Sequence, residues 1–453
     1  MGSGSVTTPD ALALGAQPND GHVVQQQPGF PAKEIPTISV AVLGLGYVGL
    51  PTGIGLATGG AKVTGIDVSE RRLQDIREGS VDLAAGEREH LRSALELNGL
   101  MLTSSPGALE AADAVMICVP TPVDDRLEPD LRMLRAACET VVAHARRDQV
   151  IVLTSTTYVG STQELLAQPL AERGLRPGRE IFVAFSPERI DPGNGHWDQC
   201  DVPRVVGGVT DRCAREAAQI VGSVSAGVHI VSSCEAAEMT KLYENTFRAV
   251  NIAWANEMAG ASRAFGLDPH EITRAAGTKP YGILTFRPGA GVGGHCIPCD
   301  PHYLLRGLRD RRADAPLTRR AMKAIESRPH VVAERVIELL EEAGVDPAEG
   351  RVLVVGASYK PGVRDTRESP AVRIMRSLWG EGVAVAYHDP LVRSLEAGDG
   401  LAILSAAHPR ACDYDLAVLV TLHDGFDYGW LGEFEHVLDC TYRTPLGAKR
   451  SLI

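Results

Sequence analysis

The stretch from Pro288 to Pro301 carries the side chains best suited to chemistry, and it reads PGAGVGGHCIPCDP. Its four glycines allow the backbone to lie against a bulky ligand, and they place Cys296 at a turn where backbone amides can lower a thiol pKa. A thiolate can add to a carbonyl carbon. A lone cysteine is usually a small buried hydrophobic residue, which is our interpretation of most of the other eight. We interpret Cys296 as a reactive thiol.

The same loop has two other interpretations. His295, Cys296, Cys299 and His302 are all suitable metal ligands, and Cys296 to Cys299 has the CxxC spacing of a redox dithiol. Four ligands so close in sequence, without a distant second pair, would form a cramped tetrahedron. We therefore predict no metal site and keep the redox dithiol as a less favoured alternative.

A glycine motif near the start of the chain points to a dinucleotide. Gly44-Leu45-Gly46-Tyr47-Val48-Gly49 directly follows an apolar run, and the next apolar run ends in Asp67. The first glycine permits a tight turn, the second lets the backbone approach a pyrophosphate, and the third allows close helix packing. Asp67 would accept hydrogen bonds from the adenosine ribose and repel a 2′-phosphate, so the motif predicts NAD rather than NADP. A merely tight turn is the alternative. The later segment Val355 to Ser358 lacks these glycines and predicts no second dinucleotide site.

The elements that must position these motifs follow from apolar periodicity. Short apolar runs alternating with amphipathic stretches are typical of a parallel βα domain. These runs are 38–43, 62–67, 114–119, 150–153 and 181–184. Residues 235–265 have helical spacing without proline and predict one long helix. Strand-like runs return at 351–355, 383–388, 416–420 and 437–439. They predict a second, smaller α/β domain, while the charged stretch 308–316 predicts a solvated loop.

Length and composition agree with several domains. A chain of 453 residues, at about 150 residues per domain, suggests about three. The 45 Lys and Arg residues against 57 Asp and Glu residues give a net charge of -12, which offers a nucleic acid no general electrostatic footprint. No apolar run reaches the roughly 18 residues of a membrane span, and no secretion signal is recognisable. The nine cysteines suit reduced thiols, so we expect a cytoplasmic protein without nucleic-acid or membrane partners.

Further motifs, together with the glycine loop and its cysteine, resemble the nucleotide-sugar 6-dehydrogenases of the UDP-glucose/GDP-mannose dehydrogenase family. They are Val119-Pro120-Thr121-Pro122, Ser186-Pro187-Glu188-Arg189, Lys241-Leu242-Tyr243-Glu244-Asn245-Thr246, Tyr359-Lys360-Pro361 and Asp365-Thr366-Arg367-Glu368-Ser369-Pro370. The resemblance runs from about residue 38 to residue 445. The Ser-Pro-Glu-Arg and Gly-Gly-His-Cys-Ile-Pro forms are more similar to the UDP-N-acetylhexosamine branch than to the UDP-glucose branch.

The resemblance implies an α/β fold in three parts. An N-terminal Rossmann NAD-binding domain would cover residues 36–233, and a central domain built on the long helix and used for dimerisation would cover 234–345. A smaller Rossmann-like domain over 346–453 would bind the nucleotide sugar. Residues 1–35, rich in Gly, Pro, Gln and Ser, are expected to be a disordered tail.

The implied reaction is a four-electron oxidation of the C6 hydroxymethyl of a nucleotide-linked hexose to the uronic acid, with two NAD+ used in succession and a cysteine thioester. In the family pattern Cys296 is the nucleophile, Asp300 handles protons with water, and Lys241 stabilises the oxyanion. Asn245, one helical turn after Lys241, would hold the sugar or an ordered water. Glu188 and Thr156 match further residues that position water.

The binding residues implied by the family fall into two sets. For NAD they are Gly44, Gly46, Tyr47, Val48, Gly49, Asp67, Arg72, Pro120, Thr121, Thr156 and Arg367. For the nucleotide sugar they are Glu188, Arg189, Lys241, Asn245, Arg248, Phe286, Arg287, Gly293 and Lys360. A homodimer or higher even oligomer is expected because the long helix carries apolar residues on more than one face, including Met239, Leu242, Phe247, Val250, Ile252 and Trp254.

Two departures from the family pattern leave the identity of the hexose open. Thr154 stands where many relatives have a glutamate, and Arg287 stands where the N-acetylhexosamine branch tends to have an aromatic ring. UDP-N-acetylglucosamine, UDP-N-acetylmannosamine and UDP- or TDP-glucose are all compatible with the sequence.

Three bland or rival interpretations remain at this point. Lys241 and Glu238 could form an ordinary exposed ion pair at i,i+3. The 6-phosphogluconate and 3-hydroxyacid dehydrogenases also join a Rossmann domain to a long helix, but they perform a two-electron oxidation without a thiol. A non-enzymatic NAD sensor would keep Gly44 to Asp67 and leave the Cys296 loop unexplained.

Overall fold

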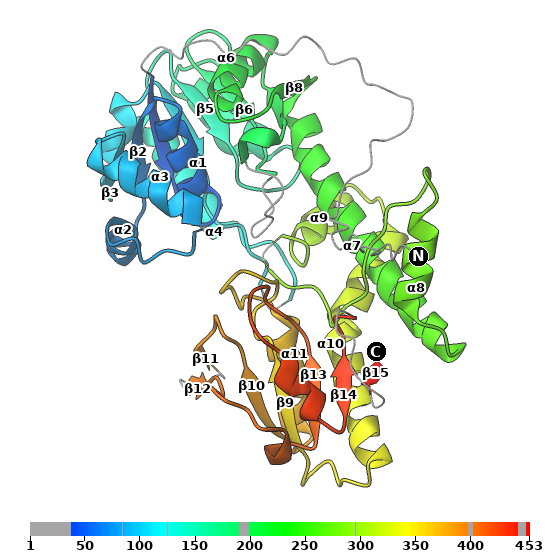
Figure 1. Ribbon diagram of the computed structural model, residues 1–453. Helices are drawn as coiled ribbons and strands as arrows, with labels where there is room; N and C mark the ends of the chain where they lie inside the picture. The colour runs from blue at the N-terminus through cyan, green and yellow to red at the C-terminus, as the bar shows by residue number, and fades with distance from the viewer. Residues whose placement is uncertain are drawn as a thin grey trace, which may run out of the picture.

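The computed structural model describes residues 38–83, 85–124, 126–189, 199–294, 296–396, 402–442 and 450–453. The expected tail over residues 1–35 and the candidate ligand His295 lie outside the described residues. Figure 1 shows two α/β lobes joined by long helices. No helix among the described residues is long and apolar enough to span a bilayer.

The first lobe is built on an eight-stranded sheet with the order β3-β2-β1-β4-β5-β6-β7-β8. Its strands are β1 (Ser39–Leu43), β2 (Lys62–Ile66), β3 (Leu100–Thr103), β4 (Ala114–Ile117), β5 (Val150–Leu153), β6 (Phe182–Phe185), β7 (Arg204–Gly208) and β8 (Val228–Val231). All neighbouring strands run parallel except β6 and β7. The order reverses between β1 and β4, which is where open α/β sheets bind ligands.

Helices cover both faces of this sheet. They are α1 (Gly49–Thr58), α2 (Glu70–Arg77), α3 (Ala85–Glu96), α4 (Arg132–His144), α5 (Gln168–Glu172) and α6 (Asp211–Gly222). Short 3-10 turns at Pro106–Ala111 and Gln199–Asp201 and a π turn at Gln163–Ala167 complete the lobe. The five predicted strands are confirmed, and the parallel βα architecture follows from their burial on both faces.

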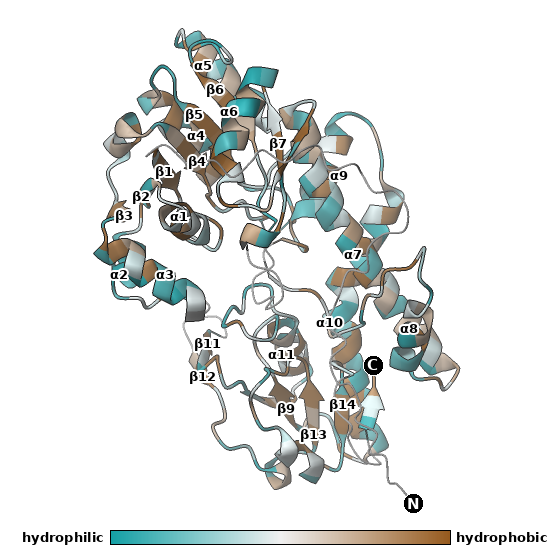
Figure 2. Cartoon of the chain, turned by 45° about the horizontal axis from the view of Figure 1, so that its top comes forward, coloured by the Kyte–Doolittle hydropathy of each residue, from teal (hydrophilic) through white to brown (hydrophobic). Residues whose placement is uncertain are grey.

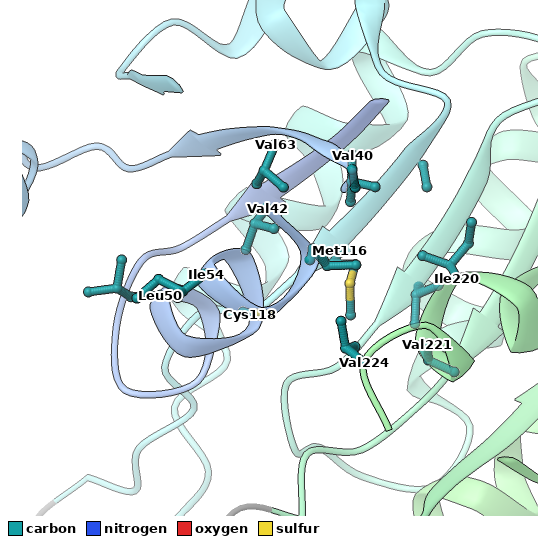
Figure 3. Close-up of a cluster of buried hydrophobic side chains, with 14 of the residues drawn as sticks. Val40, Val42, Leu50, Ile54, Val63, Met116, Cys118, Ile220, Val221 and Val224 are labelled. Atoms are coloured by element: carbon teal, nitrogen blue, oxygen red, sulfur yellow. The ribbon is translucent and has the colours of Figure 1, made fainter. Parts of the chain in front are cut away.

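The alternation of side chains along β1 divides the core of this lobe in two. Val40 and Val42 belong to one buried cluster, and Ala41 and Leu43 belong to the cluster on the opposite face. Figure 3 shows the first cluster, where side chains of β1, β2 and β4 face α1 and the end of α6. Figure 2 shows the same strands in the brown of apolar residues, with teal mainly on the outer helices.

The middle of the chain is helical, and the predicted long helix is confirmed. α7 (Cys234–Ala264) has 31 residues, and it is followed by α8 (Pro269–Gly277), α9 (Asp300–Asp310) and α10 (Pro316–Glu342). The Ser233 hydroxyl caps α7 by accepting from the Ala236 amide. α7 packs against α8, α9 and α10, as Figure 1 shows. The predicted loop 308–316 is wrong at both ends, because Leu308 to Asp310 form the last turn of α9 and Pro316 begins α10.

The second lobe confirms the predicted smaller α/β domain. Its sheet has the order β10-β9-β13-β14-β15 and is parallel throughout. The strands are β9 (Arg351–Val355), β10 (Ala384–His388), β13 (Leu416–Leu419), β14 (Val437–Asp439) and β15 (Arg450–Leu452). α11 (Pro370–Gly380) packs on α10, and β11 (Ser394–Glu396) pairs with β12 (Ala402–Leu404). Two 3-10 turns lie at Ala411–Asp413 and Gly429–Glu433.

Candidate active site

The loop from Gly44 to Gly49 has the shape that a dinucleotide pyrophosphate needs. A Cβ on Gly44, whose φ is +89°, would lie 2.8 Å from the Cys118 carbonyl oxygen, and one on Gly49 would lie 1.8 Å from the Gly44 oxygen. A Cβ on Gly46 would meet nothing within 4 Å. The outer glycines are therefore required by packing, whereas Gly46 faces open space. α1 begins at this loop with no side-chain cap and no acidic residue in its first turn, which leaves its amides available to an anion.

Asp67 lies beside this loop, immediately after β2. Its carboxylate accepts from the Leu45 amide at 2.9 Å and from the Ser69 amide at 2.9 Å. A carboxylate has about four lone-pair sites, so it can still accept from ribose hydroxyls. Arg72 Nε donates to the Leu45 carbonyl at 2.9 Å, which fixes the backbone of the loop just before Tyr47 and Val48. These residues fit NAD, which would lie with its pyrophosphate at α1 and its ribose at Asp67.

A residue of the second lobe reaches the same loop. The Arg367 guanidinium lies over the Tyr47 ring at 4.4 Å from its centroid. Asp365 holds it through two hydrogen bonds, with Nη2–Oδ2 at 2.6 Å and Nε–Oδ1 at 3.0 Å. The two lobes thus meet at the predicted cofactor loop, and Arg367 is placed to contact a phosphate there. After β4, Pro120 is exposed and the buried Thr121 hydrogen-bonds with Tyr303 of α9.

The glycines before Cys296 pack against protein rather than against open space. A Cβ on Gly293 would lie 2.5 Å from Tyr359 Cβ, and one on Gly294, whose φ is +78°, would lie 2.9 Å from the Tyr359 ring. The Gly294 amide donates to the Arg367 carbonyl at 3.0 Å. A Cβ at either position would clash with Tyr359, so packing requires these two glycines, and their expected contact with a ligand stays a prediction. They make room for the second lobe.

Cys296 opens a turn that leads into α9. The Cys299 and Asp300 amides both donate to the Cys296 carbonyl, at 3.2 and 2.8 Å. Cys296 is exposed and Cys299 is buried, and both are free thiols. The surrounding protein and the neighbouring Asp300 charge raise the pKa of Cys296, while Lys241, Arg248 and Arg367 oppose that rise. The lowered thiol pKa expected from the turn is thus wrong for this state, because desolvation outweighs the nearby cations.

Asp300 is joined to the long helix by a buried hydrogen bond. Asn245 Nδ2 on α7 donates to Asp300 Oδ2 at the start of α9, and both side chains are buried. Burial raises the pKa of Asp300 to about 6, although Lys241 and the Asn245 hydrogen bond both act to lower it. A carboxyl group with this pKa can exchange a proton near neutral pH.

Lys241 lies one turn before Asn245 and is also buried. Its Nζ donates to the Glu188 carbonyl at 2.6 Å. Glu238 is fully buried and accepts from the Gly160 amide at 2.5 Å, from the Ser161 hydroxyl and from Thr162. The alternative of an exposed ion pair between Lys241 and Glu238 is therefore excluded.

Sequence reasoning missed Arg204, which lies on β7 and is almost fully buried. It forms an ion pair with the buried Glu188 carboxylate. Arg189, beside Glu188, pairs with Glu244 of α7 at 2.6 Å. An arginine inside the otherwise apolar run 204–208 was the available signal, since a buried cation needs an acidic partner.

The remaining candidates differ in how deeply they are buried. Thr156 follows β5 and is partly buried, Arg248 is exposed on α7, and Lys360 is partly buried after β9. Phe286 packs edge-to-face on Phe247 with ring centroids 6.1 Å apart. Arg287 is exposed. Burial is the main cause of the lowered pKa of His270 on α8, and the charge of Arg287 is the second cause.

Within the part of the chain that the structure describes, no group of three or more His, Cys, Asp or Glu residues could hold a metal ion.

Comparison with known proteins agrees with this arrangement. Residues 38–224, 235–326 and 353–442 match, in turn, the NAD-binding, central and UDP-binding domains of the UDP-glucose/GDP-mannose dehydrogenase family. A UDP-N-acetyl-D-mannosamine dehydrogenase of Pyrococcus horikoshii is 35% identical over 82% of this chain and 90% of its own. An NDP-N-acetyl-D-galactosaminuronic acid dehydrogenase of Ralstonia solanacearum is 33% identical over 87% and 93%. The solved structure of the P. horikoshii UDP-D-ManNAc dehydrogenase superimposes with a TM-score of 0.83 at 32% identity, covering 92% of this chain and 99% of that one.

Proposed function

Because the chain belongs to the UDP-glucose/GDP-mannose dehydrogenase family and is an NAD-dependent nucleotide-sugar dehydrogenase, we propose that its oxidation of the hexose C6 runs through a thioester at Cys296. The observation that carries this proposal is the buried hydrogen bond between Asn245 and Asp300. It joins α7 to the start of α9 and so gathers a base, a cation and a thiol in one place.

In the alcohol step, Asp300 accepts the C6 hydroxyl proton, directly or through a water. With a pKa of about 6 it is largely ionised at neutral pH and can return the proton later. The Lys241 ammonium faces the oxygen on which negative charge develops, in a buried setting where a fixed charge is effective. The Gly44 to Gly49 loop would hold NAD+, which would supply the hydride acceptor for both oxidations.

In the aldehyde step, the Cys296 sulfur forms a bond to C6 while the double bond between C6 and its oxygen becomes single, and the thiol proton passes to that oxygen. Lys241, Arg248 and Arg367 favour the thiolate against the opposing effect of the surrounding protein and of Asp300. The resulting thiohemiacetal loses a hydride to the cofactor and its hydroxyl proton to solvent, which leaves a thioester, and water then attacks the thioester carbonyl carbon. Asp300 takes the water proton and returns it to the departing sulfur, which restores the thiol and releases the carboxylate. Glu188, Thr156 and Asn245 would position that water.

We propose a UDP-linked N-acetylhexosamine as the substrate class, because the compared relatives are named for N-acetylated sugars. The substrate would lie between the Cys296 loop and the second lobe, whose residues 353–442 match the UDP-binding domain. Arg189, Arg248, Phe286, Arg287 and Lys360 would contact it. UDP- and TDP-glucose belong in the same test, since Thr154 and Arg287 depart from the pattern of the branch.

The test is NAD+ reduction against a panel of UDP- and TDP-sugars, with NADH counted per sugar acid. Two NADH per product and almost no free aldehyde are expected, because Cys296 retains the aldehyde. One NADH per turnover would instead indicate the two-electron chemistry of the hydroxyacid dehydrogenases.

We propose further that the chain forms a homodimer or a higher even oligomer through α7. Large apolar side chains are exposed along and just after this helix, namely Met239, Phe247, Trp254, Met258 and Phe265. Leu242 is fully buried and takes no part in that surface. A mass near 48 kDa by light scattering at micromolar concentration would contradict an oligomer.

The domain boundaries at 233/234 and 345/346 and the cytoplasmic location stay predictions.

A further inference from the structure

A buried histidine and aspartate lie together in the second lobe, away from the groups used above. Asp389 follows β10 directly, His423 follows β13, and both are 2% exposed. β9 lies between these two strands in the sheet, and Ser358 follows it. The carboxyl ends of three parallel strands thus bring Ser358, Asp389 and His423 together.

The hydrogen bonds of this cluster exclude a nucleophilic triad. His423 Nε2 lies 3.2 Å from Asp389 Oδ2 and 3.3 Å from Ser358 Oγ, while Nδ1 accepts from the Gly362 amide at 3.0 Å. A triad requires the serine and the acid on different ring nitrogens. Ser358 is also fully buried, and its hydroxyl donates to the Lys360 carbonyl at 3.1 Å. The cluster therefore holds backbone rather than attacking a substrate.

The backbone that it holds is the segment from Ala357 to Gly362. Asp389 Oδ2 accepts from the Ala357 and Ser358 amides at 2.7 and 3.1 Å, which fixes the start of the segment. His423 Nδ1 fixes its end at Gly362. The side chains of Ser358, Asp389 and His423 are buried, so a lost bond would leave one of their polar atoms unpaired and away from water.

This segment contacts the nucleophile loop. Tyr359 lies in its middle and packs against the backbone of Gly293 and Gly294, two residues before Cys296. Lys360 follows it and is a candidate contact of the nucleotide sugar. A shift of this segment would move both Tyr359, which supports the Cys296 loop, and the charge of Lys360.

We propose that His423 is a positioning residue for the active site, which it serves by anchoring Gly362 and thereby placing Tyr359 under the Cys296 loop. The proposal rests on the proposed function, because Cys296 and Lys360 take their roles from it. His423 touches neither substrate nor cofactor and acts only through the segment 357–362.

Two substitutions separate the anchoring bond from the rest of the ring. The Asn side-chain oxygen can occupy the place of Nδ1, so His423→Asn keeps an acceptor for the Gly362 amide. The Gln side-chain amide reaches the place of Nε2, so His423→Gln keeps the contacts with Asp389 and Ser358 but loses that acceptor. The first variant is the matched control for the second.

The first readout needs no substrate. Full-length protein is alkylated with iodoacetamide, and the modification of Cys296 is followed by peptide mass spectrometry, with the exposed Cys412 as an internal reference. We expect His423→Gln to alkylate at Cys296 about fivefold faster, since the variant loses the bond that fixes the segment 357–362 beneath the Cys296 loop. His423→Asn should stay close to wild type, and Cys412 should react equally in all three proteins.

The second readout is kinetic. His423→Gln should raise KM for the nucleotide sugar about tenfold while KM for NAD+ stays nearly constant, because Lys360 moves and the Gly44 loop does not. Equal effects of Gln and Asn, or no effect of Gln on alkylation and KM, would overturn the positioning role. If wild type oxidises no sugar, the proposed function fails while the alkylation comparison still decides this inference.

If a His423 variant does not fold, a measurement on the wild type still tests the proposal. Hydrogen exchange at the Gly362 amide should be slow, since its proton is donated to Nδ1 of the buried His423. Fast exchange there would overturn the proposal without any substitution.

Discussion

Replacing Asp300 by asparagine should stabilise the protein and remove its activity. The pKa of Asp300 rises from its ordinary 3.8 to about 6, chiefly through burial. This shift of about 2 pH units corresponds to about 3 kcal/mol in the free energy of unfolding at neutral pH. Asparagine has almost the same shape and can still accept from Asn245, so the buried charge is the main change. The gain is an upper value, because Lys241 would lose its nearby negative charge.

The sign follows from proton binding. Between pH 4 and pH 6 the native Asp300 holds a proton that the unfolded chain has released. The contribution of Asp300 to the stability of the wild type therefore falls as the pH rises through this range and levels off above it. The variant lacks this group, so the stability difference should be near zero below pH 4 and reach its full value above pH 6.

The assay is urea unfolding followed by intrinsic fluorescence from pH 4 to pH 8. Asp310→Asn, an exposed carboxylate at the other end of α9, is the control and should show little difference. Loss of the proton acceptor should lower kcat of Asp300→Asn by about 10²- to 10⁴-fold. A stability difference that does not change with pH, or a less stable variant at pH 7, would refute the reasoning.

Three further predictions concern single side chains. Cys296→Ser should lose overall turnover and keep sugar-nucleotide affinity by calorimetry, since a hydroxyl lacks the nucleophilicity of a thiolate; wild-type turnover would exclude the thioester. Asp67→Ala should bind NAD+ more weakly and reject NADP+ less, because it removes a ribose acceptor and a repelling charge beside Arg72. An unchanged ratio of kcat/KM for the two cofactors would mean that Asp67 does not contact the ribose. Mild peroxide should inactivate the wild type reversibly through a Cys296–Cys299 disulfide, because the turn hydrogen bond between these residues holds their Cα atoms within about 7 Å. An equal and irreversible loss of activity in the wild type and in Cys299→Ala would show that Cys299 is only a packing residue.

The strands and the long helix could be predicted because their signals are local. Apolar runs located β1, β2, β4, β5 and β6, and the periodicity over 235–265 located α7. β7 and β8 escaped prediction, since β7 contains Arg204 and two glycines and β8 is only partly buried. β15 has three residues, too few for a pattern.

The site was predictable only where its members share one element. Lys241 and Asn245 are four residues apart on one helix, so their common face followed from helix geometry. The pairing of Glu188 with Arg204 crosses from β6 to β7, and the contact of Tyr359 with Gly293 joins two lobes. No periodicity links such distant residues.

The sequence by itself determined the α/β architecture, the cofactor loop and the residue types available for catalysis, because each depends on neighbours a few positions away. The tertiary structure decided what surrounds them. It placed Asp300 in a buried site where its pKa rises to about 6, and it packed enough protein around the Cys296 thiol to outweigh the nearby cations and raise the thiol pKa. It also set Tyr359 beneath the nucleophile loop. Desolvation and charge depend on which distant segments pack together, and packing exists only once the chain has folded.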